Sequence, residues 1–160
     1  MSRPTLPYVK ALMKPTVTCS NFDLIDIIAL PDLGSTLTLI DHNHRILSND
    51  KCVIRPTDLI VRSFNDAATV CQGETTIVFV SPNGKSMTLN ALITKMSAGC
   101  DLILGYNIMK QFKLTLDREK LTLEMKTPEV FMSFPLMKNT TYHATNSILL
   151  RPYTQVEIET

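Results

Sequence analysis

The 160-residue sequence predicts an all-β domain with one short helix. Residues 75–80 and 86–93 lie on either side of the turn sequence SPNG; the first run is rich in β-branched residues, and polar and apolar residues alternate at the start of the second. Apolar and polar residues also alternate at 114–116 and 121–125, on either side of a charged turn. A period of two is typical of strands with one buried face, and turns rich in Pro, Asn and Gly join such strands into hairpins. Both pairs therefore predict β-hairpins, and in the second we expect the leucines on one face.

The N-terminal half supplies further strands. Residues 6–12 predict an edge strand, because prolines flank them. A polar turn at 21–23 leads into an apolar, β-branched strand at 24–30, and a second apolar run follows at 37–40. Residues 41–45 predict a polar loop or a short helix that continues towards Leu47, and residues 48–58 predict no regular element.

The second half completes the expected fold. Residues 59–64 and 69–73 predict a hairpin with its tip at 65–68, and residues 101–104 predict a short strand. A helix is expected at 107–112, where Ile108 and Phe112 share one face. Beyond residue 127 the pattern loosens, with one or two further strands within 148–158. We therefore expect one domain at 1–126 and a β-rich extension at 127–160 that packs on it or leads to the next module.

Composition excludes several classes of function. Sixteen basic and fifteen acidic residues give no field that would attract nucleic acid or a membrane surface. Tryptophan is absent and aromatic residues make up 6% of the chain, so surfaces for base stacking are scarce. No run approaches the roughly 20 apolar residues that span a bilayer, and the N-terminus lacks a signal-peptide pattern. We expect a soluble, intracellular protein that binds neither nucleic acid nor membrane.

The sequence also predicts no metal and no cofactor. The four cysteines are scattered without a Cys-x-x-Cys pair, which favours free thiols in a reducing compartment. Asp41, His42 and His44 lie close together in the chain. Two histidines two residues apart, without a third convergent ligand, are typical of a solvated loop rather than of a metal site.

The stretch at 28–37 reads IALPDLGSTL and carries the strongest candidate for chemistry. An apolar strand ends in Asp32, turns at Gly34 and continues through the hydroxyls of Ser35 and Thr36 into the next apolar run. A carboxylate between two buried strands is costly unless it is solvated, hydrogen-bonded or catalytic. A capping aspartate in an ordinary turn is the alternative interpretation.

A second motif, CDLILGYNIM at 100–109, runs from a strand through Gly105 into the expected helix. The two motifs, in this order, resemble the retropepsin family, the single-domain aspartic proteases of retroviruses and long-terminal-repeat retrotransposons, and in particular those of gypsy-type elements. The resemblance covers residues 8–126. It implies a closed β-barrel that forms a two-fold homodimer; an unrelated small β-barrel is the alternative.

The resemblance implies roles for individual residues. Asp32, Gly34 and Ser35 match the family's catalytic loop, and we expect the Ser35 hydroxyl to donate a hydrogen bond to the Asp32 carboxylate. The hairpin tip matches the flap that closes over substrate: Phe64, Asn65, Asp66, Ala67 and Ala68. The other motif positions are expected to be structural: Leu33, Thr36, Asp101, Ile103, Leu104 and Gly105.

Two residues depart from the family pattern. The family has Thr or Ser where this chain has Leu33, and Pro31 is unusual directly before the aspartate. The family's threonine hydrogen-bonds across the two-fold axis, which a leucine cannot do. Peptide hydrolysis by carboxylates needs two of them sharing one proton, and this chain has one Asp-x-Gly loop, so a second copy must supply the other.

Three functions therefore remain open. In the first, the chain is a homodimeric aspartic-protease-like domain whose peptide hydrolysis is weak or absent because of Leu33. In the second it is a fully active endopeptidase that processes a polyprotein, and in the third it is a catalytically silent module for dimerisation or protein interaction. The expected partners are a second copy of the chain and an extended peptide segment or protein.

Overall fold

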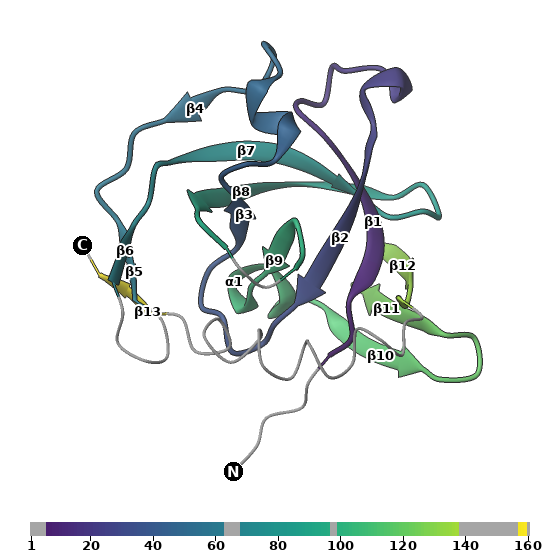
Figure 1. Cartoon of the computed structure of the whole chain (residues 1–160). Helices are drawn as coiled ribbons and strands as arrows, with labels where there is room; N and C mark the ends of the chain where they lie inside the picture. Colours follow the sequence, from purple (N-terminus) through teal and green to yellow (C-terminus); the bar gives the residue numbers. More distant parts are fainter. Residues whose placement is uncertain (1–5, 63–67, 97–98, 138–156, 160) are drawn as a thin grey trace.

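The computed structural model describes residues 6–62, 68–96, 99–137 and 157–159. A seven-stranded sheet with the order β1-β2-β9-β3-β8-β7-β4 forms its main part, and β1 also pairs with β7 (Figure 1). All of these strands except β4 therefore close into a barrel. Their bounds are β1 Val9–Lys14, β2 Ile25–Pro31, β3 Leu39–Asp41, β4 Ile54–Arg55, β7 Gly73–Val80, β8 Ser86–Thr94 and β9 Leu102–Leu104. The expected all-β class with one short helix is confirmed.

Strand β1 confirms a strand near the N-terminus, but it lies inside the closed sheet, so its expected position at an edge is wrong. It pairs antiparallel with β2 from Val9↔Ala29 to Met13↔Ile25, and with β7 from Leu12↔Val80 to Lys14↔Val78. Pro7 and Pro15 lie just outside the bounds of β1. Every residue of the strand therefore keeps the N–H that a ladder on two sides requires.

Both predicted hairpins are confirmed. Strands β7 and β8 pair from Gly73↔Ile93 to Val80↔Ser86, and Gly84 adopts φ +91° in the turn between them. Strands β10 (Lys113–Asp117) and β11 (Thr122–Lys126) flank the charged turn. Leu123 and Met125 of β11 are buried whereas Thr122 and Glu124 are partly exposed, as the alternation predicts.

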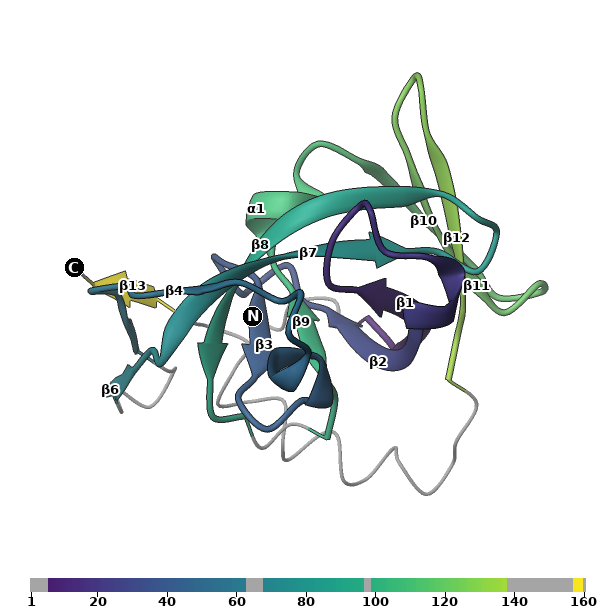
Figure 2. The same cartoon turned by 90° about the horizontal axis from the view of Figure 1, so that it is seen from above.

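Residues beyond 126 continue the same packing. Strand β12 (Phe131–Pro135) pairs antiparallel with β11, and its Met132 and Phe134 belong to the main hydrophobic core. The Phe134 ring stacks on Phe79 of β7 with 5.3 Å between centroids. Figures 1 and 2 place the sheet β10-β11-β12 at one end of the barrel and β13 at the other.

The hairpin expected at 59–73 is present as β5 (Ile60–Arg62) and β6 (Ala68–Val70). Ala68 lies in the strand rather than in the tip, and residues 63–67 lie outside the described residues. A third strand, β13 (Glu157–Glu159), pairs with β5. It falls within the region where a late strand was expected.

Helical turns are few and short. Helix α1 spans Tyr106–Met109 and is shorter than the helix expected at 107–112. The 3-10 turns η1 (Asn21–Asp23) and η2 (Arg45–Ser48) occupy the expected polar turn and the run towards Leu47. Within the described part of the chain, no helix has the length and apolar character to cross a membrane.

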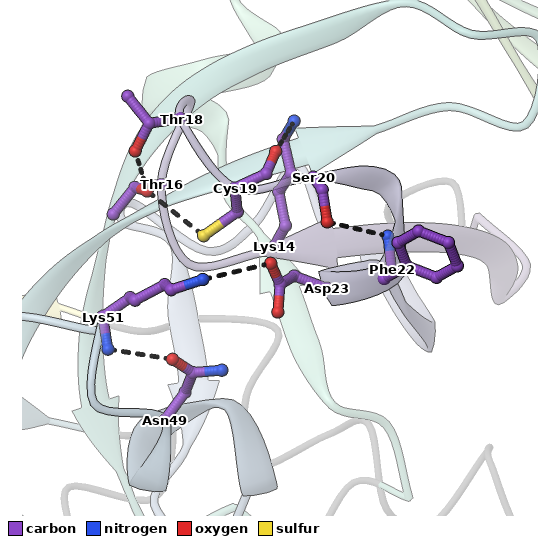
Figure 3. A network of polar contacts seen from close by, with 9 residues as sticks. All are labelled: Lys14, Thr16, Thr18, Cys19, Ser20, Phe22, Asp23, Asn49 and Lys51. Atoms are coloured by element: carbon purple, nitrogen blue, oxygen red, sulfur yellow. Dashed lines mark hydrogen bonds and ion pairs between the residues drawn. The ribbon is translucent and has the colours of Figure 1, made fainter.

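A polar network holds the connection between β1 and β2, at the end of β2 opposite Asp32 (Figure 3). The Lys14 Nζ donates to the Cys19 carbonyl at 3.0 Å, and Lys51 Nζ lies 3.4 Å from an Asp23 carboxylate oxygen. Asp23 belongs to η1, and Lys51 lies in the turn after η2. The ion pair therefore fixes two loops against each other without involving the Asp32 loop.

Candidate active site

Asp32 lies where two parallel strands end together. Strands β2 and β9 pair in parallel up to Pro31↔Leu104. Pro31 has no N–H, but the next residue, Asp32, donates its N–H to the Leu104 carbonyl at 2.9 Å. The strand ladder thus continues past the proline, and Asp32 starts its loop from a fixed position with 8% of its surface exposed.

The loop after Asp32 is a tight turn around its carboxylate. The Gly34 N–H donates to Asp32 Oδ1 at 2.9 Å, and the Ser35 N–H donates to the Asp32 carbonyl at 3.1 Å. A backbone N–H that donates to a carboxylate oxygen restricts the rotamer of that side chain. Asp32 and Gly34 therefore lie together in one tight turn.

Ser35 is used differently from the expectation. Its side chain is fully buried, and its Oγ donates to the Leu37 carbonyl at 2.8 Å. The expected hydrogen bond to the Asp32 carboxylate is therefore wrong, because the hydroxyl has one proton and gives it to its own loop. The Ser35 carbonyl accepts from the Tyr106 N–H at 2.7 Å, and the Thr36 carbonyl accepts from the Asn107 N–H at 3.2 Å. Thr36 and Ser35 thus seat the loop on the start of α1.

Thr38 and Asn107 complete this seat, and the sequence analysis missed both. The Thr38 Oγ1 donates to Asn107 Oδ1 at 3.0 Å and accepts from the Gly105 N–H at 3.0 Å. Thr38 is 1% exposed. A hydroxyl flanked by leucines in an apolar run was the available signal, because a buried hydroxyl needs a partner.

Gly105 is required by close packing. A Cβ built on Gly105 would overlap the Leu37 carbonyl group and lie 3.0 Å from Asn107 Oδ1. The preceding residues Ile103 and Leu104 are buried, and Ile103 pairs with Leu39 of β3. The backbone of the second motif, at Leu104 and Gly105, therefore packs directly against the segment that contains the Asp32 loop.

Asp101 joins strands together. Its Oδ2 accepts the Ile28 N–H at 2.8 Å, its own N–H donates to the Ile28 carbonyl at 2.9 Å, and its carbonyl accepts the Asp41 N–H at 3.1 Å. These three hydrogen bonds attach β2 and β3 to the start of β9. The carboxylate has a structural role that is independent of the Asp32 loop.

His44 lies beside Asp101 and is a buried structural residue. Its Nδ1 accepts the Ile46 N–H at 3.1 Å, so the ring caps η2, and its Nε2 lies 3.9 Å from Asp101 Oδ1. Burial lowers the pKa of His44, and the nearby Asp101 carboxylate opposes that shift. Among the described residues no group of three His, Cys, Asp or Glu side chains is arranged to hold a metal ion.

Two exposed apolar side chains belong to the Asp32 loop and to the helical turn that the loop contacts. Leu33, directly after Asp32, is 37% exposed, and Tyr106 at the start of α1 is 51% exposed. Other large apolar side chains of the described chain are more exposed: Val17 at 67%, Val70 at 69% and Phe22 at 100%. Exposure alone therefore does not distinguish Leu33 and Tyr106 from the rest of the surface.

The residues expected to form a flap are described only in part. Phe64, Asn65, Asp66 and Ala67 lie outside the described residues, and Ala68 is exposed in β6. Val61 of β5 is 5% exposed and belongs to a second hydrophobic cluster together with Leu30 and Leu39. These two leucines flank the Asp32 loop, so β5 packs beside the candidate site.

The cysteine nearest to this region is chemically quiet. Burial raises the pKa of the Cys100 thiol to about 12, and the neighbouring Asp101 carboxylate adds to the rise. All four cysteines are free, as expected. At neutral pH the Cys100 thiol is therefore protonated and is a poor nucleophile.

The architecture matches a solved protein. The crystal structure of the retroviral protease-like domain of Ddi1 from Leishmania major superposes with a TM-score of 0.54 and 13% sequence identity, covering 86% of this chain and 98% of that one. No protein-family model matches the sequence, and neither does any curated protein. The fold of this chain is therefore retropepsin-like.

Proposed function

We propose that this chain is a retroelement-derived aspartic-protease-like domain of the gypsy type, homodimeric, with peptide hydrolysis weak or absent because of Leu33. The observation that carries the proposal is the Asp32 carboxylate, which is buried at the paired ends of β2 and β9 and held by the Gly34 N–H in a barrel of the retropepsin type.

A homodimer follows from the chemistry. Two carboxylates sharing a proton are needed, one to activate water and the other to protonate the carbonyl oxygen. Asp101 is engaged with Ile28 and strand pairing, so it is not the second member. The partner carboxylate is then Asp32 of a second copy, facing the first across a two-fold axis.

Leu33 weakens such a site. A hydrogen bond across the axis that a threonine would donate is missing, and an unpaired buried acceptor costs about 1–3 kcal/mol. A displacement of reacting groups by about 1 Å costs about a hundredfold in rate. Leu33 instead adds exposed apolar surface to the same loop.

The two alternatives rest on separate observations. The retained hydrogen bond between Gly34 N–H and Asp32 Oδ1 favours a fully active endopeptidase that processes a polyprotein. The exposed Leu33 side chain, which cannot donate a hydrogen bond across the axis, favours a silent module for dimerisation or protein interaction. The substrate or partner is an extended peptide segment or a protein, and the packing of Val61 in β5 with Leu30 and Leu39 supports this choice.

The test is the variant Asp32→Asn compared with wild type in cleavage of an extended-peptide library, with sedimentation of both proteins. The matched control is Asp26→Asn, the same change on an exposed residue of β2. We expect dimers throughout, weak cleavage by wild type and by the control, and a loss of about 100-fold or more in Asp32→Asn. Equal rates in all three proteins favour the silent module, and a strict monomer contradicts the proposal.

A further inference from the structure

Strand β5 has partners on both of its edges. It pairs antiparallel with β6 from Ile60↔Val70 to Arg62↔Ala68, and with β13 from Ile60↔Glu159 to Arg62↔Glu157. Figure 1 shows β13, in yellow, lying along this hairpin although it comes from the C-terminal end of the chain. Without β13, β5 would be an edge strand of a two-stranded hairpin.

An open edge of this kind accepts extended segments. Unpaired N–H and C=O groups along an edge form main-chain hydrogen bonds with any strand of suitable register. The alternate side chains of the added strand then determine which sequences bind. Here the segment on the edge has the pattern acidic, apolar, acidic, with Ile158 opposite Val61. A three-residue strand binds weakly by itself, but attachment to the same chain raises its effective concentration to about the millimolar range.

Strand β5 packs near the Asp32 loop, so its pairing with β13 bears on that loop. Val61 belongs to the same hydrophobic cluster as Leu30, two residues before Asp32, and Leu39 at the start of β3. The Cys71 N–H also donates to the Leu59 carbonyl, which closes the base of the hairpin. A strand added to β5 therefore restrains the hairpin that packs beside the Asp32 loop.

We propose that Glu157–Glu159 is a built-in strap, which occupies the outer edge of β5, restrains the hairpin and competes with other extended segments for that edge. The partner class for the vacated edge is an extended peptide with an apolar residue between two acidic ones. The regulatory consequence rests on the proposed function of the Asp32 loop, whereas the occupancy of the edge does not.

The occupancy is tested by amide hydrogen exchange on the full chain and on a variant lacking residues 157–160. In a central strand, successive N–H groups point to opposite edges, so within β5 only the amides that face β13 are expected to exchange faster. Those that face β6 are an internal control. We expect a rise of at least about tenfold at the former, with the barrel strands unchanged.

A synthetic peptide with the sequence YTQVEIET, residues 153–160, is then added to the truncated protein. It is expected to restore protection at the same amides with a dissociation constant of about 0.1 mM, because tenfold protection at an effective concentration of about a millimolar requires an affinity of this order. A peptide with Ile158→Pro is expected to fail, because proline lacks the N–H and breaks the pairing. Full-length Ile158→Pro should reproduce the truncation, and Ile158→Val should not. Unchanged exchange after truncation, or equal protection by both peptides, overturns the proposal.

The regulatory part has its own readout. If wild type cleaves extended peptides, truncation should raise kcat/KM several-fold, and Asp32→Asn should abolish cleavage in both backgrounds. An unchanged kcat/KM, with the exchange result intact, removes the regulatory role and leaves the docking site. A protein without any cleavage contradicts hydrolysis at the Asp32 loop but leaves the exchange and peptide results to decide the strap.

Discussion

Thr38 and Asn107, 69 residues apart in the chain, meet through a 3.0 Å hydrogen bond from Thr38 Oγ1 to Asn107 Oδ1. The same hydroxyl accepts the Gly105 N–H. The pair thus joins the strand that leaves the Asp32 loop to the helical turn on which the loop rests. Both partners are needed, because Thr38 is buried and its oxygen has no access to water.

Removal of this hydroxyl should destabilise the fold. Thr38→Val keeps the shape and leaves the Gly105 N–H and the Asn107 amide without this partner, so we expect a loss of about 1–3 kcal/mol in the free energy of unfolding. Urea unfolding measures it. Thr38→Ser retains the hydroxyl and is expected to lose less; a Val variant as stable as wild type would show that the bond contributes little.

A threonine at position 33 should raise the activity that we propose for the Asp32 loop. Leu33→Thr supplies a hydroxyl that can donate across the axis of the proposed dimer, and we expect kcat to rise by about tenfold to a hundredfold. Leu33→Val is the matched control, since valine has the shape of threonine without the hydroxyl. A similar gain in both variants would assign the effect to loss of the exposed leucine instead.

His44 should make stability depend on pH. Its pKa is lowered in the folded protein, so the unfolded chain takes up the proton first as pH falls. The stability that neutral His44 supplies is fully present above its ordinary pKa of about 6.5 and is lost as pH falls through the lower folded pKa. We compare urea unfolding at pH 7.5 and 5 for wild type and His44→Asn, which retains a side-chain oxygen for capping η2. Wild type should lose more stability; an equal loss in both would remove His44 as the cause.

Leu121 offers a stabilising substitution. It is the non-glycine residue with positive φ in the described chain, at +56°, in the turn between β10 and β11, and its side chain is 47% exposed. A side chain in this region is strained, and glycine is not. We expect Leu121→Gly to raise the free energy of unfolding by about 0.5–1 kcal/mol, measured by thermal or urea unfolding. Leu121→Ala keeps the Cβ and should bring no gain; if it stabilises equally, relief of strain is not the reason.

Local pattern was sufficient for much of the strand content. The β7–β8 and β10–β11 hairpins follow from alternation and turn chemistry within about ten residues. The pairing of β1 on both of its edges could not be predicted from the sequence, because its second partner, β7, lies far along the chain. The start of α1 at Tyr106 also depended on tertiary contacts, because its first two N–H groups donate to the carbonyls of Ser35 and Thr36 in the Asp32 loop.

The amino-acid order alone established the all-β class, the position of Asp32 at a strand end, and the Gly105 motif that pairs with it, since each follows from short-range periodicity and turn residues. Only the three-dimensional packing decided that Ser35 donates to Leu37, that Thr38 joins Asn107, and that Asp101 holds Ile28. A hydroxyl has one proton to donate and a carboxylate has two acceptor oxygens, so each can form hydrogen bonds with several different groups. The fold determines which of these groups lie within reach. The same reason applies to β13 on β5, because a pairing between strands so distant in sequence has no local signal.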